Sequence, residues 1–194
     1  MSAQPAEHRA AEHRAAEHRP AEHRAAQPGA AKRARPVVVQ KYGGSSVGDA
    51  SRIRRVAQRI ARTRETGADV VCVVSAMGDT TDELLQLAAA ITDDPNPREL
   101  DMLLATGEHQ SATLVSMALH ALGVQAISLT GAQAGITTDA SHGRARIANV
   151  EPRRVRRELD KGSVVIVAGF QGQRQRQGPE DDDDGPGETT TLGR

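Results

Sequence analysis

The sequence predicts an α/β fold in which a mostly parallel β-sheet is sandwiched between helices. Apolar, strand-like runs alternate along residues 37–172 with segments whose apolar residues recur at helical spacing. One of these runs, residues 70–74, contains no polar residue between the apolar ones, which is typical of a strand covered on both faces. Strands that alternate with helices in this way favour a parallel sheet with helices on both sides.

A glycine-rich turn separates the first strand from the first helix. Residues 37–42 are predicted to form a buried strand, and the turn occupies residues 43–48. Asp49 is the expected N-cap of the helix, and Gly67 is expected to end it. The helix itself is indicated by a single apolar stripe, which consists of Ile53, Val56, Ala57, Ile60 and Ala61.

The second strand is followed by a second helix. Thr80 or Thr81 is expected to cap this helix, whose apolar pattern continues to Ile91. Pro95 and Pro97 follow, and proline disrupts the hydrogen bonding of a helix interior, so the helix is expected to end before them.

Two helical stretches and two further strands complete the pattern. Helical spacing resumes over residues 98–104 and again over 108–122. Strands are predicted at 125–129 and 163–168, with a helix near 155–159 between them. Ligands of parallel sheets collect at the carboxyl ends of the strands. That rule points to four segments, which are residues 41–46, 75–81, 130–138 and 169–172.

Charge and cysteine content narrow the possible classes of protein. Lys+Arg and Asp+Glu balance at 25 each, so neither nucleic acid nor a membrane surface is expected as a partner. No apolar run reaches the ~18 residues that span a bilayer, and the polar N-terminus does not resemble a secretory signal. The single cysteine, Cys72, lies in an apolar run, as expected of a buried thiol in a reducing compartment. We therefore predict a cytoplasmic protein.

Two segments of low complexity flank the globular pattern. Residues 1–36 contain the unit Ala-Glu-His-Arg four times with a period of five residues, which places the copies on different sides of a helix. Residues 173–188 contain a run of four aspartates at 181–184. The histidines and the aspartates could bind metal, but the composition favours a solvated tail and a solvated acidic loop. We thus predict a tail over residues 1–36 and one domain over 37–194 that includes the acidic loop.

A lysine and two glycines mark the junction of the first strand and the first helix. Gly43 and Gly44 allow the backbone to approach a phosphate, and successive amides at the start of a helix favour an anion. Lys41 adds a full positive charge beside them. The spacing is neither that of a Walker loop nor that of a dinucleotide-binding turn. These residues alone leave two interpretations open, a phosphate cradle or a tight turn beside a surface lysine.

Six motifs occur in order between residues 39 and 194. They are Val-Gln-Lys-Tyr-Gly-Gly-Ser-Ser-Val at 39–47, Val-Ser-Ala-Met-Gly-Asp-Thr-Thr-Asp-Glu-Leu at 74–84, Thr-Gly-Glu at 106–108, Thr-Gly-Ala-Gln-Ala-Gly-Ile at 130–136, Val-Ala-Gly-Phe-Gln-Gly at 167–172 and Thr-Thr-Leu-Gly-Arg at 190–194. Together they resemble the aspartate kinases, which have the amino-acid kinase fold.

The resemblance implies an enzyme that transfers the γ-phosphate of ATP to the β-carboxylate of L-aspartate and forms 4-phospho-L-aspartate. This reaction is the first step of lysine, threonine and methionine biosynthesis. The resemblance further implies that Mg²⁺ arrives with ATP and needs no site of its own in the protein. The complete family member is expected to form a homo-oligomer or to pair with a regulatory chain.

The resemblance also assigns roles to individual residues. Lys41 would contact the transferred phosphoryl group as the catalytic residue. The nucleotide would be bound by Lys41, Gly43, Gly44, Ser45 and Ser75. The residues implied to hold aspartate are Ser75, Thr81, Glu108 and Arg194, of which Glu108 would pair with the α-ammonium group.

Alternatives remain open at several of these residues. Ser75 and Thr81 could be helix caps, and Glu108 could be a carboxylate in the first turn of a helix. The sequence also departs from the family, because its loop at 173–188 is long and acidic. The resemblance implies that the rest of the catalytic domain would follow Arg194. The chain could thus be an inactive remnant that binds a partner or a phosphate weakly. It could also be an amino-acid kinase for another substrate, such as glutamate.

Overall fold

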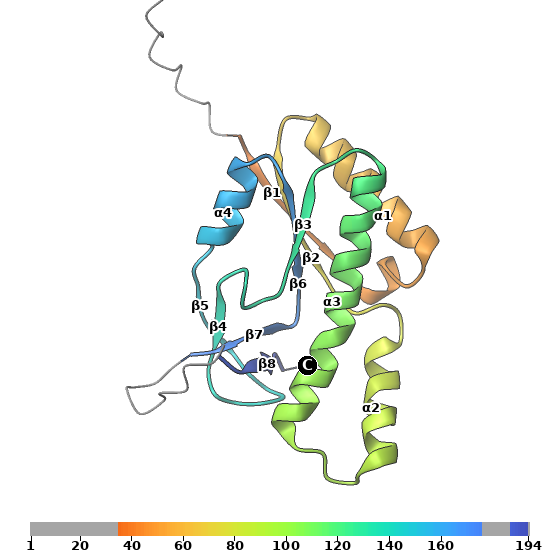
Figure 1. Cartoon of the computed structure of the whole chain (residues 1–194), viewed down its shortest axis with the longest axis vertical. Helices are drawn as coiled ribbons and strands as arrows, with labels where there is room; N and C mark the ends of the chain where they lie inside the picture. The colour runs from red at the N-terminus through yellow and green to blue at the C-terminus, as the bar shows by residue number, and fades with distance from the viewer. Residues whose placement is uncertain (1–34, 176–186, 194) are drawn as a thin grey trace, which may run out of the picture. The chain divides into compact units, whose positions relative to one another are not determined.

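The computed structural model describes residues 35–175 and 187–193, and it confirms the predicted α/β class (Figure 1). Its main sheet is parallel throughout, with the strand order β1-β2-β6-β3. The strands of this parallel sheet are β1 (Val37–Tyr42), β2 (Asp69–Val74), β6 (Val164–Ala168) and β3 (Ala126–Leu129). Because all of them run in one direction, their carboxyl ends meet at the same edge of the sheet, where ligands bind in such folds.

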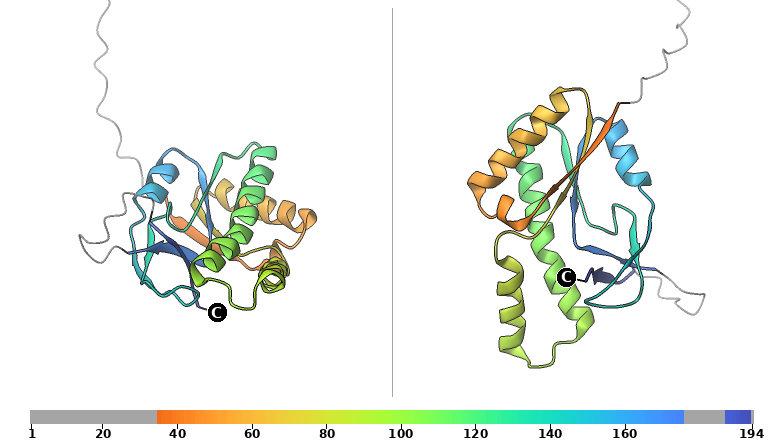
Figure 2. Two further views of the ribbon diagram at one scale, coloured as in Figure 1. Left: turned by 60° about the horizontal axis from the view of Figure 1, so that its bottom comes forward. Right: turned by 180° about the vertical axis from the view of Figure 1, so that it is seen from behind.

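Helices cover both faces of the parallel sheet (Figures 1 and 2). The helices α1 (Ala50–Glu65) and α3 (Pro97–Ala121) lie on one face, and α4 (Arg153–Asp160) lies on the other. Successive residues of β2 enter the two cores in turn, since Cys72 packs on the side of α1 and α3 whereas Val71 packs on the side of α4. The sequence-based prediction of helices on both faces is confirmed.

The helix α1 begins and ends as its sequence predicts. The Asp49 side chain caps it by accepting a hydrogen bond of 2.8 Å from the amide of Arg52. Its last residue is Glu65, and Gly67 follows with φ of +88°, a conformation that glycine adopts without strain. The apolar stripe is buried except for Ala61, which is half-buried. Local residue pattern and capping chemistry were sufficient for this element.

The expectation of a buried first strand is wrong for one face of β1. Val37 and Val39 on that face expose 53% and 66% of their surface. The cause is position, because β1 lies at the edge of the sheet and pairs with β2 alone among the described strands. The helix on that face, α4, packs against β2 and β6 instead. An apolar strand sequence does not reveal whether the strand will be central or at an edge.

The two helices after β2 differ from their prediction at two points. The helix α2 (Thr80–Ile91) begins at Thr80 with Asp79 in the N-cap position, so neither threonine caps it. Two helical stretches were expected between residues 98 and 122, but the structure has one continuous helix, α3, of 25 residues. Gly107 lies within α3 without interrupting it, and the helix passes so close to the loop after β2 that a Cβ on Gly107 would lie 2.9 Å from the Ala76 Cβ.

A second, mixed sheet was not predicted. Its strands are β5 (Ile147–Val150), β4 (Ile136–Thr138), β7 (Gln171–Arg174) and β8 (Thr189–Thr191), in the order β5-β4-β7-β8. Residues 130–138 and 169–172 were expected to be loops, and the acidic loop was expected to begin at residue 173, whereas β7 extends to Arg174. These strands are only three or four residues long and rich in polar residues, so they lack the apolar runs by which strands are recognised.

Several predictions fall on residues that the structure does not describe. The Ala-Glu-His-Arg repeats, the aspartate run at 181–184 and Arg194 all lie outside the described residues. The division into a tail and one domain therefore remains a prediction. Within residues 35–175 and 187–193, no helix has both the length and the apolar character needed to cross a bilayer.

Candidate active site

The glycine-rich turn after β1 folds as a short 3₁₀ helix, η1 (Gly44–Ser46), directly before α1. The amide of Ser46 donates to the Gly43 carbonyl over 2.9 Å. Gly44 lies against the loop after β2, where a Cβ would be 2.8 Å from the Ala76 carbonyl oxygen. A Cβ at Gly43 would instead meet no atom within 4 Å. The turn is thus packed on the Gly44 side and open on the Gly43 side, as a backbone cradle for an anion requires.

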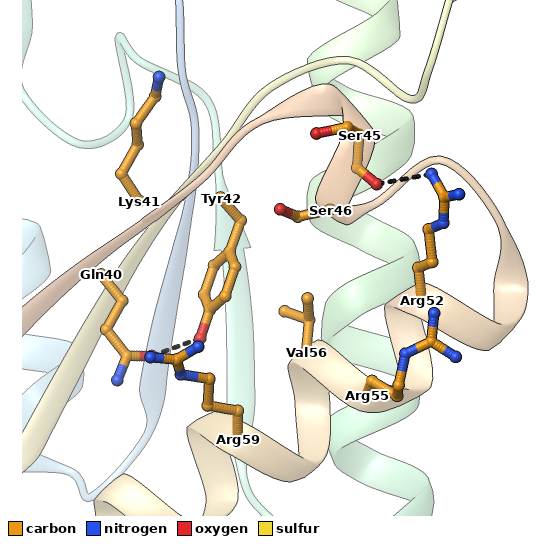
Figure 3. Close-up of a pocket in the computed structure, with 9 residues that line it drawn as sticks. All are labelled: Gln40, Lys41, Tyr42, Ser45, Ser46, Arg52, Arg55, Val56 and Arg59. Carbon is orange, nitrogen blue, oxygen red and sulfur yellow. Dashed lines mark hydrogen bonds between the residues drawn. The ribbon is translucent and has the colours of Figure 1, made fainter.

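Lys41 stands beside this turn with its charge available. Figure 3 shows its side chain pointing in the opposite direction from those of Gln40 and Tyr42, its neighbours along β1. Lys41 is exposed, and no carboxylate of the described residues lies within 4.0 Å of its ammonium group. A lysine without an ion-pair partner at the carboxyl edge of a parallel sheet is free to bind an anionic ligand.

A polar hollow of about 600 Å³ lies where the cradle meets α1 (Figure 3). Three arginines of α1 line it, namely Arg52, Arg55 and Arg59. Arg52 donates a hydrogen bond of 2.8 Å to the Ser45 carbonyl and pairs with Asp49 at 3.2 Å. These arginines add positive potential beside the cradle, and the sequence analysis did not single them out. Their spacing of three and four residues along one predicted helix, which places them on the same side of it, is the sequence feature that could have identified them.

The loop after β2 carries two further predicted site residues. Ser75 is half-buried, and its amide donates to the Tyr42 carbonyl over 3.0 Å, which joins the ends of β1 and β2. Thr81 lies in the first turn of α2 and is also half-buried. The interpretation of Thr81 as a helix cap is wrong, and Ser75 caps neither α2 nor any other described helix. Both residues lie near the carboxyl edge of the parallel sheet.

Glu108 reaches the same loop from the middle of α3. Its side chain is 4% exposed, and Oε1 accepts a hydrogen bond of 3.2 Å from the Ala76 amide. The alternative of a first-turn helix carboxylate is wrong, because α3 begins at Pro97. A buried carboxylate next to Ser75 and Ala76 can accept hydrogen bonds from an ammonium group.

The structure therefore brings together most of the residues that the sequence resemblance implies. Contacts within the described chain join the cradle to the loop after β2 and that loop to Glu108. Arg194 follows β8 and Gly193 in the sequence, but it lies outside the described residues. The roles of these residues in binding remain proposals.

No group of three or more potential metal ligands occurs among the described residues. The expectation that Mg²⁺ arrives with ATP remains a prediction. The glycine turn and Lys41 supply amide and ammonium donors, which suit phosphate oxygens rather than a bare cation.

Residues 36–189 match the sequence pattern of the Amino acid kinase family. Aspartokinases are among the similar proteins. Those of Mycolicibacterium smegmatis and Geobacillus stearothermophilus are 58% and 54% identical to this chain over 158 residues. The alignments cover 81% of this chain but only 35% and 36% of those proteins, so the chain spans about a third of their length.

Solved structures agree with this assignment. Aspartate kinase from Synechocystis matches with a TM-score of 0.63 and 46% identity, over 82% of this chain and 24% of that one. E. coli aspartokinase III in complex with aspartate and ADP matches with a TM-score of 0.65 over 82% of this chain and 44% of that one, and its 23% identity supports the fold alone. The predicted resemblance to aspartate kinases is confirmed, and the chain belongs to the amino acid kinase family.

Proposed function

We propose that this chain forms the N-terminal part of the catalytic domain of an aspartate kinase, which transfers the γ-phosphate of ATP to the β-carboxylate of L-aspartate. The observation that carries the proposal is the meeting of the glycine cradle, Lys41 and buried Glu108 at the carboxyl edge of one parallel sheet. The identity of 51–58% to aspartokinases supports it.

The proposed chemistry needs charge neutralisation and alignment rather than a base. The β-carboxylate of aspartate has a pKa near ~4 and is already ionised at neutral pH, so no group has to remove a proton. Two anions must approach each other, and positive charge is required where they meet. Lys41 would stabilise the moving phosphoryl group, and the amides of Gly43, Gly44 and Ser45 would hold the phosphates together with Ser75. Mg²⁺ carried by ATP would neutralise part of the phosphate charge.

The amino-acid substrate would lie between α3 and the loop after β2. Glu108 would accept hydrogen bonds from its α-ammonium group, and Ser75 and Thr81 would contact its carboxylates. Arg194 would bind one carboxylate through a bidentate pair, which arginine geometry favours. The product, 4-phospho-L-aspartate, would place the enzyme at the first step of lysine, threonine and methionine biosynthesis. We further propose a cytoplasmic location and an oligomer of the complete enzyme.

The direct test is a phosphoryl-transfer assay on the purified chain with Mg·ATP. ADP release is followed with and without L-aspartate, and hydroxylamine traps the acyl phosphate as a hydroxamate. We expect ADP release that depends on aspartate and is lost in Lys41→Ala. L-Glutamate serves as the competing acceptor, and faster turnover with glutamate would assign a different amino-acid kinase activity.

A second candidate function is a binding remnant without catalysis. The exposed valines of β1 favour it, because an unpaired strand edge with apolar side chains can pair with another chain. Under this alternative the chain binds Mg·ADP weakly and forms a complex with a partner, but it shows no aspartate-dependent ADP release. Size-exclusion chromatography alongside the kinase assay separates the two functions.

A further inference from the structure

Three arginines of α1 border one side of the hollow beside the glycine turn (Figure 3). They are Arg52, Arg55 and Arg59, and their spacing of three and four residues places them on one side of the helix. The first and the last are seven residues apart, which is roughly 10 Å along the helix axis. The hollow measures about 600 Å³, a size within the range of about 300–1,000 Å³ that is usual for small-molecule sites.

Two of these arginines carry a charge that no carboxylate neutralises. Arg55 makes one long hydrogen bond, of 3.4 Å, to the Ser51 hydroxyl. Among residues 35–175 and 187–193, neither Arg55 nor Arg59 has a carboxylate oxygen within 4.0 Å. Arg52 does have such a partner, since it pairs with Asp49 at 3.2 Å. Like charges at this spacing repel one another, so an anion bound between them would be stabilised.

The wall of the hollow that faces α1 is polar but uncharged. Tyr42 is 8% exposed, and its hydroxyl donates to Oε1 of Gln40 over 2.9 Å. Burial raises the pKa of Tyr42, and the nearby charge of Arg59 only opposes this rise, so the hydroxyl keeps its proton at neutral pH. None of the described residues that line the hollow carries a carboxylate. The space therefore has positive charge on one side and no negative charge to balance it.

The hollow is separate from the space proposed for the phosphates of ATP. Lys41 lies between Gln40 and Tyr42 along β1, and successive side chains of a strand point to opposite faces of the sheet. Figure 3 shows the Lys41 side chain pointing away from the two neighbouring side chains that border the hollow. A ligand held by Arg55 and Arg59 would thus lie on the α1 face of β1, whereas the Lys41 ammonium group serves the other face.

We propose that this hollow is a second anion site, which binds a small molecule with two or more phosphate groups. Guanidinium groups bind phosphate oxygens through paired hydrogen bonds. A span of roughly 10 Å between the outer arginines favours an extended ligand over a single phosphate. The site uses neither Lys41 nor Glu108, so it goes beyond the proposed kinase activity and does not depend on it.

Tyr42 supplies a local signal for the test, because it is the single tyrosine of a chain that has no tryptophan. Its fluorescence is recorded while the 194-residue chain is titrated with tripolyphosphate, which does not absorb light in this region. The ionic strength is held constant, since salt screens such interactions. We expect a saturable change in fluorescence and a Kd about tenfold lower than that for inorganic phosphate, which reaches fewer arginines.

The test variants are Arg55→Gln and Arg59→Gln, which remove the two charges that lack a carboxylate partner. Each should raise the Kd for tripolyphosphate about tenfold, because a charge-assisted hydrogen bond to phosphate is lost. The matched control is Arg54→Gln, which removes an exposed charge from the same helix outside the hollow and should change the Kd by less than about twofold. Lys41→Ala should also retain the fluorescence change, since the lysine points away from the hollow.

Each other outcome would overturn the proposal in a defined way. Equal weakening in Arg54→Gln, Arg55→Gln and Arg59→Gln would show unspecific attraction to a basic helix. Loss of binding in Lys41→Ala alone would assign the ligand to the glycine cradle. Tighter binding of citrate or of a poly-aspartate peptide would assign the hollow to carboxylates or to a protein partner. These readouts require no phosphoryl transfer, so an inactive chain that binds tripolyphosphate through Arg55 and Arg59 would refute the proposed kinase function and retain the anion site.

Discussion

The Oε1 atom of Glu108 accepts a hydrogen bond of 3.2 Å from the amide of Ala76, although the two residues are 32 positions apart. Glu108 belongs to the middle of α3, and Ala76 lies in the loop after β2. The adjacent residue Gly107 makes this contact possible, because a side chain there would collide with Ala76. One hydrogen bond thus places the carboxylate proposed for the amino acid beside the loop proposed for the phosphates.

Glu108→Gln separates the charge of Glu108 from its structural contact. The glutamine carbonyl can still accept from Ala76, so the melting temperature should stay close to that of the wild type. Loss of a charge-assisted hydrogen bond to an ammonium group, worth about 1.5–3 kcal/mol, should weaken aspartate binding by roughly 10- to 100-fold. Differential scanning fluorimetry and an aspartate titration check both parts. Unchanged aspartate affinity would remove Glu108 from the binding site.

In a chain extended to the whole catalytic domain, Lys41→Ala should damage turnover more than binding of aspartate. The positive charge meets negative charge on the moving phosphoryl group, and that interaction is strongest in the transition state. Loss of such a contact typically lowers kcat by about 10²–10³-fold. Steady-state kinetics give kcat and KM, with Lys161→Ala as the control, since Lys161 is an exposed lysine that pairs with Glu158. A Lys41→Ala enzyme with near-normal kcat would rule out the catalytic role.

Gly44→Ala should destabilise the fold, whereas Gly43→Ala should not. The new Cβ at Gly44 would lie 2.8 Å from the backbone oxygen of Ala76, and forced overlap of this kind costs about 1–3 kcal/mol. Gly43 has φ of −75° and ψ of 169°, which alanine also adopts, and open space beside it. Urea denaturation of the two variants measures the difference. Equal stability would contradict the close approach of the turn to the loop after β2.

Cys72 should be unreactive in the folded protein. It is fully buried, and burial raises the pKa of its thiol to about 12, so the nucleophilic thiolate is absent at neutral pH. It is also the single cysteine of the chain, which makes labelling unambiguous. We expect a thiol reagent such as DTNB to react at the rate of unfolding and immediately in denaturant. Rapid labelling of the native chain would contradict the buried position of β2.

Glu188 should contribute stability that disappears in acid. Hydrogen bonds from Arg174, supported by those from Arg98, lower the pKa of Glu188 from its ordinary value of 4.5. A carboxylate with a lowered pKa stabilises the fold above its unfolded pKa, and the contribution is lost as the pH falls through the folded value. The difference in melting temperature between wild type and Glu188→Gln should therefore be present at neutral pH and shrink below about pH 4.5. A constant difference across this range would contradict the ion pairs around Glu188.

Local patterns of residues predicted the four strands of the parallel sheet and the helix α1. The stripe from Ile53 to Ile60 and the cap at Asp49 placed α1, because a helix face and its first turn are formed by residues close in sequence. The same reasoning failed for β4, β5, β7 and β8, which are only three or four residues long and form one sheet through the pairing of β4 with β7, more than 30 positions further along the chain. It also divided α3 at Gly107, where a contact with Ala76 explains the glycine.

The sequence by itself determined the family, the order of the main strands and helices, and the position of the glycine turn beside Lys41. These features depend on residue type and on spacing within a few positions. Only the tertiary structure decided that Glu108 meets Ala76, that Asp101 binds Thr191 90 residues away, and that one face of β1 is exposed. Such hydrogen bonds, and the position of a strand at the edge of a sheet, depend on segments that are distant along the chain. No local pattern of residues therefore encodes them.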